Sequence, residues 1–309
     1  MQTPRLKIGT RGSRLALAQA EETRQRLSAA HGFDPSEIEI VAITTTGDRI
    51  RDRPLNEIGG KGLFTKEIEE ALQSGSIDLA VHSMKDMPAR LPAHLVIAAL
   101  LPREDARDAL ISPHCTSIGD LAQACVVGSA SVRRAAQLKR LRPDISVVNL
   151  RGNVETRLAK LDRGEVSATF LACAGLIRLG LAHRITAPVP EDEMLPAVAQ
   201  GAIGIEIRDN DKRIRDLLGA VNHAPTEIAV ACERAFLASL DGSCRTPIAG
   251  HATISSESLS FAGLIISPDG TASHEVRLDG PARDAARIGA EAAKAVRARA
   301  GETFFDSWA

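Results

Sequence analysis

The 309-residue sequence is poor in aromatic residues, which make up 3% of it, with one tryptophan and no tyrosine. Few rings are therefore available for the bases of a single-stranded nucleic acid to stack on. Neither sign of charge dominates, because 38 Lys and Arg stand against 39 Asp and Glu, a formal net charge of -1. No overall field would attract nucleic acid or an anionic membrane, so any bound anion must be held by a local cluster.

Long hydrophobic runs are also missing. No apolar run approaches the roughly 20 residues needed to span a bilayer. The start of the chain, Met1 to Arg5, lacks the apolar stretch of a secretory signal. We therefore expect a cytoplasmic protein with no membrane partner.

Cysteine is scarce and irregularly placed. The five cysteines are an odd number without the close spacing of a zinc knuckle or a redox motif: Cys115, Cys125, Cys173, Cys232 and Cys244. We expect them to be mostly reduced and structural, and we predict no metal site.

The composition that is present is typical of a globular protein, with 44% hydrophobic and 25% charged residues. The length favours two or three domains of roughly 100 residues each. Short β-branched runs alternate with helical patterns, which is typical of βα units around a largely parallel sheet. A first series predicts strands at 6–9, 38–44, 77–81 and 95–101, with helices at 13–30 and 63–73. A second predicts strands at 125–128, 145–150 and 168–172, followed by helices that open near Ser131, Asn153 and Ala174.

The domain division follows from changes in this pattern. The charged segment 103–108 predicts a crossing point between domains, and part of 196–208 is expected to return as a strand to the first sheet. From residue 224 a long helix at 226–240, three short strands and an Ala-rich helix indicate a smaller α+β unit. We predict an α/β protein with a first lobe at 1–102 plus about 200–220, a second lobe at 103–199 and a C-terminal domain at 221–309. A ligand site is expected between the two lobes.

Arginine recurs where predicted strands lead into helices. It stands in Thr10-Arg11-Gly12-Ser13, in the segment from Ser129 to Arg134, and in Arg151-Gly152-Asn153. A helix N-terminus favours anions, and the guanidinium fork matches a carboxylate or a phosphate. The pattern predicts a ligand with several negative charges. The alternative for each arginine is an ion pair at the surface.

Three further segments carry reactive side chains. Gly59 to Phe64 is a glycine-rich turn without the Walker spacing, which favours a structural turn or a ligand-covering loop. Asp86 follows a predicted strand and is an acid/base candidate or a turn aspartate, whereas His82 is interpreted as a packed histidine. Cys244 lies on a loop after a helix that Gly242 is expected to cap, so it is either a nucleophile assisted by Arg245 or an incidental exposed thiol.

These segments, in this order, resemble the porphobilinogen deaminase (hydroxymethylbilane synthase) family, from about Leu6 to the middle of the third domain. The resemblance rests on Arg11-Gly12-Ser13, Gly59 to Phe64, Val81 to Asp86, Val132-Arg133-Arg134, Leu150 to Asn153, Gln200-Gly201-Ala202 and Cys244. It implies a monomeric three-domain enzyme whose first two lobes are folded like periplasmic binding proteins. Its dipyrromethane cofactor would be attached to Cys244 through a thioether. Four porphobilinogen units would be added in turn, each losing ammonia, before water releases hydroxymethylbilane.

The resemblance also implies roles for individual residues. Asp86, with Arg11 and Lys85, would be catalytic, because its carboxylate can stabilise the positive charge that develops on a pyrrole nitrogen. Cofactor contacts would come from Ser13, Lys85, Asp86, Ser129, Ser131, Arg133, Arg134, Arg151 and Gly152. Substrate contacts would come from Arg11, Arg151, Arg157, Arg178, Lys61, Phe64 and Gln200, with Lys61 and Phe64 on a mobile loop and Gln200 by the lobe hinge.

The sequence departs from the family at Arg14, where proline is frequent, at Ser129-Ala130, and at Ser243, which replaces a usual glycine. Ala130 removes one hydroxyl contact, and Ser243 would be strained if the loop required a positive φ there. Two rival functions stay open at this point. One is a carboxylate or phosphate receptor without catalysis, and the other is a nucleotide-dependent transferase built on the Lys61 loop.

Overall fold

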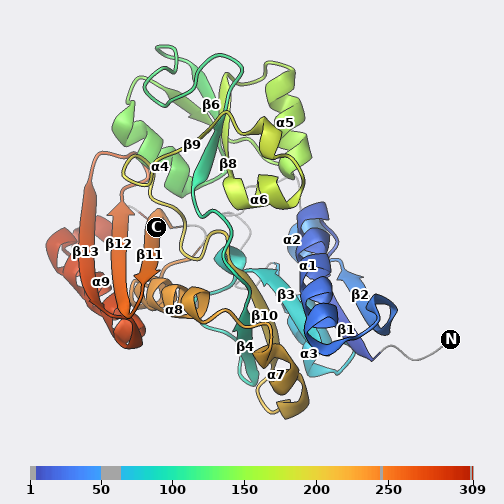
Figure 1. Ribbon diagram of the computed structural model, residues 1–309. Coiled ribbons are helices and arrows are strands. Elements are labelled where there is room, and N and C mark those ends of the chain that lie inside the picture. Colours follow the sequence, from blue (N-terminus) through green and yellow to red (C-terminus); the bar gives the residue numbers. More distant parts are fainter. Residues whose placement is uncertain (1–4, 50–63, 244–245, 307, 309) are drawn as a thin grey trace. The chain divides into compact units, whose positions relative to one another are not determined.

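The computed structural model describes residues 5–49, 64–243, 246–306 and 308. The chain forms two compact units, Met1–Arg103 with Ala202–Glu227, and Glu104–Gly201 with Ile228–Ala309. Figure 1 shows the elements of both units. The further division of the second unit into a lobe at 103–199 and a domain at 221–309 stays a prediction. Lys61, Cys244 and Arg245 lie outside the described residues.

The first unit is built on a five-stranded sheet with the order β2-β1-β3-β10-β4. β1 pairs in parallel with β2 and β3, whereas β10 is antiparallel to β3 and β4. The strands are β1 (Leu6–Arg11), β2 (Ile38–Ile43), β3 (Leu79–Ser83), β4 (Leu95–Leu100) and β10 (Ile203–Arg208). The prediction that part of 196–208 returns to the first sheet is thus confirmed.

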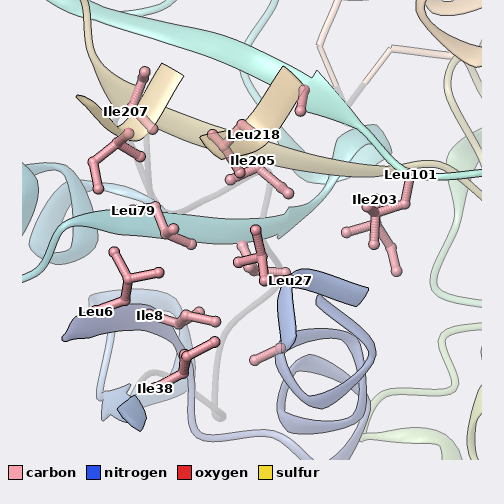
Figure 2. Packing of buried hydrophobic residues seen from close by; sticks show 14 of the residues in the cluster. Leu6, Ile8, Leu27, Ile38, Leu79, Leu101, Ile203, Ile205, Ile207 and Leu218 are labelled. Atoms are coloured by element: carbon pink, nitrogen blue, oxygen red, sulfur yellow. The ribbon is translucent and has the colours of Figure 1, made fainter. Parts of the chain in front are cut away.

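Helices cover both faces of this sheet. α1 (Arg14–His31) and α7 (Lys212–Gly219) bury Leu27 and Leu218 against one face, where Ile8, Leu79 and Ile205 are also buried, as Figure 2 shows. α3 (Lys66–Gln73) covers the other face, and the short α2 (Thr46–Arg49) follows β2.

The second unit repeats this arrangement. Its five-stranded sheet has the order β7-β6-β8-β5-β9, with β6 parallel to β7 and β8, and β5 antiparallel to β8 and β9. The strands are β5 (Asp108–Ile111), β6 (Val126–Gly128), β7 (Ser146–Val148), β8 (Ala168–Ala172) and β9 (Ala187–Pro188). β6 therefore has the place that β1 has in the first sheet. The two five-stranded sheets thus share one strand order.

α4 (Val132–Leu141) covers one face of the second sheet, and α5 (Val154–Asp162) and α6 (Cys173–Arg178) cover the other. The same unit contains an antiparallel sheet of β11 (Ile248–Ser255), β12 (Ser258–Ile266) and β13 (Ser273–Pro281). Ala136 of α4 packs against Leu264 and Ile266 of this sheet. α8 (Ala224–Ser239), which begins in the first unit, α9 (Ala285–Ala300) and α10 (Glu302–Asp306) complete the chain.

The fold class is the predicted one, α/β with a smaller α+β part. In the portion of the chain that the structure describes, none of the helices combines the length and apolarity that crossing a membrane requires.

The end of α8 differs from the prediction that Gly242 caps it. Asp241 takes the left-handed conformation there, with a φ of 52°. A Cβ at Gly242 would lie 2.4 Å from Cδ1 of Ile248 and 2.6 Å from Cδ1 of Leu237, so the ends of these two side chains would have to shift to admit one. Ser243 is not among the described residues with a positive φ, so this departure from the family introduces no backbone strain.

Candidate functional site

In the first unit, polar side chains meet where β1 and β3 end. These strands are parallel neighbours, so their carboxyl ends lie at the same edge of the sheet, where open α/β sheets collect their ligands. Arg11 ends β1, and Ser13 begins α1 by accepting a hydrogen bond from the amide of Ala16 at 3.3 Å. Ser83 ends β3, and Lys85 and Asp86 follow it in a short 3₁₀ turn. The structure thus brings the predicted site residues Arg11, Ser13, Lys85 and Asp86 to the edge of the sheet where β1 and β3 end.

Arg11, Ser13, Ser83 and Asp86, but not Lys85, line a pocket of about 50 Å³. This volume is enough for a group of carboxylate size, since one water needs only about 10–15 Å³. Asp86 is exposed at its rim. The residues around the pocket are Arg11, Ser13, Leu15, Ala16, Gln19, Phe64, Thr65, Val81, His82, Ser83, Asp86 and Met87. The residues around this small space thus include an aspartate, an arginine and two serines.

Arg11 is held by two contacts. Its Nε lies 3.3 Å from Oδ2 of Asp48, and its Nη2 bonds the other oxygen of that carboxylate. The guanidinium carbon lies 4.2 Å from the centre of the Phe64 ring, a distance typical of a cation–π contact. Burial raises the pKa of Asp48, but hydrogen bonds from Arg11 and Thr45 outweigh it and hold that pKa below its ordinary value. The anion that Arg11 contacts here is part of the protein.

Gln19 was not predicted as a site residue. It is 4% exposed in α1, lines the pocket and donates from Nε2 to Oγ of Ser83 at 2.8 Å. No sequence signal marked it, because a glutamine within an amphipathic helix is ordinary. His82 is buried as expected, with its Nε2 3.0 Å from Oε2 of the fully buried Glu206.

In the second unit, the segment after β6 begins α4. Ser131 caps the helix by accepting from the amide of Arg134 at 3.4 Å, and Oγ of Ser129 accepts from the amide of Ser131 at 3.2 Å. Both hydroxyls thus make local hydrogen bonds. Their predicted contacts with the cofactor stay a prediction.

Arg133 and Arg134 are 4% and 5% exposed and contact Asp108, the first residue of β5. Nη1 of Arg133 lies 2.7 Å from Oδ2 of Asp108, and Nη2 of Arg134 lies 2.7 Å from Oδ1. Gln200, 1% exposed, donates from Nε2 to the same Oδ1 and to the carbonyl of Ala106, each at 2.8 Å. Asp108 was not predicted as a site residue. We refer to Asp108, Arg133, Arg134 and Gln200 as the Asp108 cluster.

The third arginine junction follows β7 and starts α5. Gly152 has a φ of 127°, and a Cβ there would lie 2.6 Å from Cγ2 of Thr156, so only glycine fits. Asn153 caps the helix through the amide of Thr156 at 2.9 Å, and Nε of Arg157 donates to the carbonyl of Gly152 at 2.8 Å. Nη1 of Arg151 is buried without a hydrogen-bond partner among the described residues.

The remaining predicted residues are spread over both units. Arg178 is half-buried at the end of α6, after β8. The four cysteines within the described ranges are free thiols, of which Cys115, Cys173 and Cys232 are buried and Cys125 is half-buried. Burial raises the pKa of the Cys173 and Cys232 thiols to about 12, so neither is a thiolate at neutral pH.

Comparisons with known proteins agree with the resemblance found in the sequence. Residues 6–216 match the family model "Porphobilinogen deaminase, dipyromethane cofactor binding domain", and residues 227–298 match "Porphobilinogen deaminase, C-terminal domain". The porphobilinogen deaminase of Nitrobacter hamburgensis is 58% identical over 302 residues, covering 98% of this chain and 96% of that protein.

Solved structures of similar shape include a periplasmic substrate-binding protein of an ABC transporter from Coxiella burnetii. It is 16% identical and has a TM-score of 0.42, over 74% of this chain and 96% of that one. A putative methionine-binding lipoprotein from Bacillus subtilis is 12% identical, with a TM-score of 0.44, over 71% of this chain and 90% of that one. The family models and the Nitrobacter relative together establish that this chain belongs to the porphobilinogen deaminase family.

Proposed function

We propose that Asp86, Arg11 and Lys85 carry out the chemistry of the family's reaction in this chain. The enzyme joins four porphobilinogen units on a covalently bound dipyrromethane primer and releases hydroxymethylbilane by hydrolysis. For each unit, a carbon–nitrogen bond breaks, ammonia leaves and a carbon–carbon bond forms. The hydrogen displaced from the pyrrole carbon leaves as a proton.

The observation that carries the proposal is the pocket at the ends of β1 and β3, which Asp86 and Arg11 both line. Loss of ammonia from porphobilinogen places positive charge on its pyrrole nitrogen. An ionised carboxylate accepts hydrogen bonds from pyrrole N–H groups and stabilises that charge, the role we assign to Asp86. Arg11 and Lys85 supply cations for the acetate and propionate groups.

The residues of the second unit fit a primer that bears carboxylates. Nε of Arg133 and Nη1 of Arg151 are buried and have no hydrogen-bond partner among the described residues. An unsatisfied buried donor is unfavourable, and a carboxylate would remove that penalty. When bound, the primer supplies the free pyrrole carbon to which new units are joined. We propose that it is attached to Cys244 and held by Ser13, Lys85, Asp86, Ser129, Ser131, Arg133, Arg134, Arg151 and Gly152.

Substrate binding is assigned by the same reasoning. Porphobilinogen carries one acetate and one propionate, so a growing chain accumulates negative charge that several arginines would balance. We assign Arg11, Arg151, Arg157 and Arg178 to these carboxylates. Lys61, Phe64 and Gln200 complete the proposed set.

The proposed activity is tested directly with purified protein that has been incubated with hydroxymethylbilane to form the primer. We expect this protein to consume porphobilinogen and to release hydroxymethylbilane and ammonia. A carboxylate receptor would bind porphobilinogen but leave its concentration unchanged. Unchanged porphobilinogen would therefore contradict the proposal.

An Arg151→Gln variant should bind porphobilinogen more weakly. A hydrogen bond to a charged group contributes about 1.5–3 kcal/mol, so we expect KM to rise roughly 10- to 100-fold. The measurement is the dependence of the initial rate on porphobilinogen concentration. Arg163→Gln is the matched control, because Arg163 caps the other end of α5 and pairs with the exposed Glu165. An Arg151→Gln variant with the KM of this control would remove Arg151 from its assigned role.

The proposal also includes a monomer that works in the cytoplasm and binds no nucleic acid. The near balance of charges and the low content of aromatic residues support the last point. Sedimentation of the purified protein alone tests whether it has the mass of a monomer. Sedimentation with single-stranded DNA tests whether it binds nucleic acid, and we expect the sedimentation coefficient of the protein to be unchanged.

A further inference from the structure

The Asp108 cluster contains an imbalance of buried charge. Two guanidinium groups, of Arg133 and Arg134, contact a single carboxylate, that of Asp108, and the side chains of all three are at most 6% exposed. Asp108 is the one acidic residue that pairs with either arginine in the described part of the chain. The cluster therefore carries a surplus of one positive charge away from water, where an unpaired charge is costly.

The surplus is located mainly on Arg133. Arg134 is fully engaged, since its Nε and Nη2 donate to Asp108 and its Nη1 donates to the carbonyl of Phe170 at 2.8 Å. Arg133 uses Nη1 for Asp108 and for the carbonyl of Leu195 at 2.7 Å, but its Nε is buried without a partner. The cluster thus has one cation more than its single carboxylate balances. Nε of Arg133 and Oδ2 of Asp108 are both buried there without a hydrogen-bond partner among the described residues, although Oδ2 has the ion-pair contact with Nη1 of Arg133.

We propose that Asp108 is the internal counterion of a two-arginine anion site: it holds Arg133 and Arg134 together in the protein without primer, and the site then accepts one carboxylate of the primer. The inference rests on the proposed function in one respect, namely that the primer supplies this carboxylate. Asp108 is a positioning residue, because it acts through the two arginines.

The electrostatics of the cluster agree with this assignment. Burial opposes the charge on Asp108, but attraction to Arg133 and Arg134 outweighs it and lowers the pKa of the carboxyl below its ordinary value, so Asp108 is charged at neutral pH. Burial lowers the pKa of Arg133, Asp108 raises it, and the like charge of Arg134 lowers it again, with a lowered pKa as the result. One internal carboxylate therefore does not compensate Arg133 completely.

The cluster also connects the site to the chain segments on either side of the second lobe. Leu195 accepts hydrogen bonds from Arg133 and, at 3.1 Å, from Nε2 of Gln137. Gln200 bonds Asp108 and the carbonyl of Ala106. Asp108 thus links the start of β5 to the start of α4 through Arg133 and Arg134, and to the segment 195–200 through Gln200.

The experiment measures thermal unfolding of the protein without primer and of the primer-loaded protein, for the parent chain and for Asp108→Asn. Without primer, the variant leaves two buried cations with no counterion, and we expect its Tm to fall by about 10 °C. In the primer-loaded variant, a primer carboxylate replaces part of the lost negative charge. We therefore expect the Tm of the loaded variant to lie below that of the loaded parent by less than half of the difference found without primer. The gain in Tm on loading should therefore be larger in Asp108→Asn than in the parent.

The matched control is Asp144→Asn. Asp144 binds Arg142 at the other end of α4, in an ion pair that is partly exposed, so we expect shifts of only about 2 °C in both forms. Equal falls of Tm in the two forms of Asp108→Asn, or a larger fall in the loaded form, would overturn the counterion role.

A second variant covers the case in which Asp108→Asn does not fold without primer. Asp108→Asn combined with Arg134→Gln removes one charge of each sign and restores the original surplus. We expect the double variant without primer to fold and to melt above the single variant, and failure to do so would contradict the inference. If the parent chain acquires no primer mass, the proposed function fails, and the comparison of the two variants without primer still decides the role of Asp108.

Discussion

A Cys244→Ser variant should contain no covalent cofactor and should have no measurable turnover. A serine hydroxyl is a far weaker nucleophile than a thiolate, so no primer would be attached on which porphobilinogen units could be joined. The measurement is the intact mass of the denatured protein after incubation with hydroxymethylbilane. We expect the parent chain to gain two linked pyrrole units and the variant to keep the mass of its bare sequence.

The other cysteines provide the controls for this experiment. Cys173 and Cys232 are buried, and burial raises their thiol pKa to about 12, which leaves them unreactive at neutral pH. Burial also raises the pKa of Cys125. Replacement of Cys125 or Cys232 by Ser should therefore leave the mass gain intact. A full mass gain in Cys244→Ser would place the attachment on another residue.

An Asp86→Asn variant should keep its cofactor and lose most of its turnover. An amide has no negative charge with which to stabilise the cationic pyrrole, and it cannot assist proton transfer. General acid–base groups contribute roughly 10²- to 10⁴-fold to rates, so we expect kcat to fall by that factor. The measurement pairs the initial rate of porphobilinogen consumption with the intact mass, which shows that the primer is present.

Asp78→Asn is the matched control for Asp86→Asn. Asp78 lies just before the other end of β3, where its Oδ2 accepts from the amide of Lys7 at 2.8 Å and its Oδ1 lies 3.3 Å from Nη2 of Arg213. Asp78 does not line the pocket, and Asp86 follows the opposite end of β3. Loss of the Asp78 carboxylate should therefore leave kcat within about twofold of the parent at a temperature where both are folded. If Asp86→Asn behaves like this control, Asp86 has no catalytic role.

Most helices and strands of the fold could be predicted from the sequence because their apolar residues recur with the period of a helix or a strand. The strands β1, β3 and β8 and the long helices α1 and α8 follow apolar patterns that tertiary packing then uses. β5 was missed, because its first residue is charged and the segment before it reads as a polar crossing. The buried carboxylate of Asp108 is compensated by partners far along the chain: Arg133 and Arg134, the latter 26 residues later, and Gln200, 92 residues later. A local pattern does not contain such partners.

The three arginine junctions show the same limit at the site. They look alike in sequence, and each was predicted to bind a ligand or to form an ion pair at the surface. In the structure Arg11 contacts Asp48, 37 residues away, Arg134 contacts the buried Asp108, and Arg151 retains a buried donor without a described partner. The sequence indicates that anions are bound at such places, but the structure determines which anion is internal.

The central claim is that one thiol, that of Cys244, holds a pyrrole primer. It is tested most directly by tryptic digestion of the protein after incubation with hydroxymethylbilane. Cleavage after Arg234 and Arg245 separates Cys244, in the peptide Ala235 to Arg245, from Cys232, which lies in the preceding peptide. We predict that the peptide with Cys244 is heavier by two linked pyrrole units and that the peptide with Cys232 is unchanged. An unmodified Ala235 to Arg245 peptide would contradict the account.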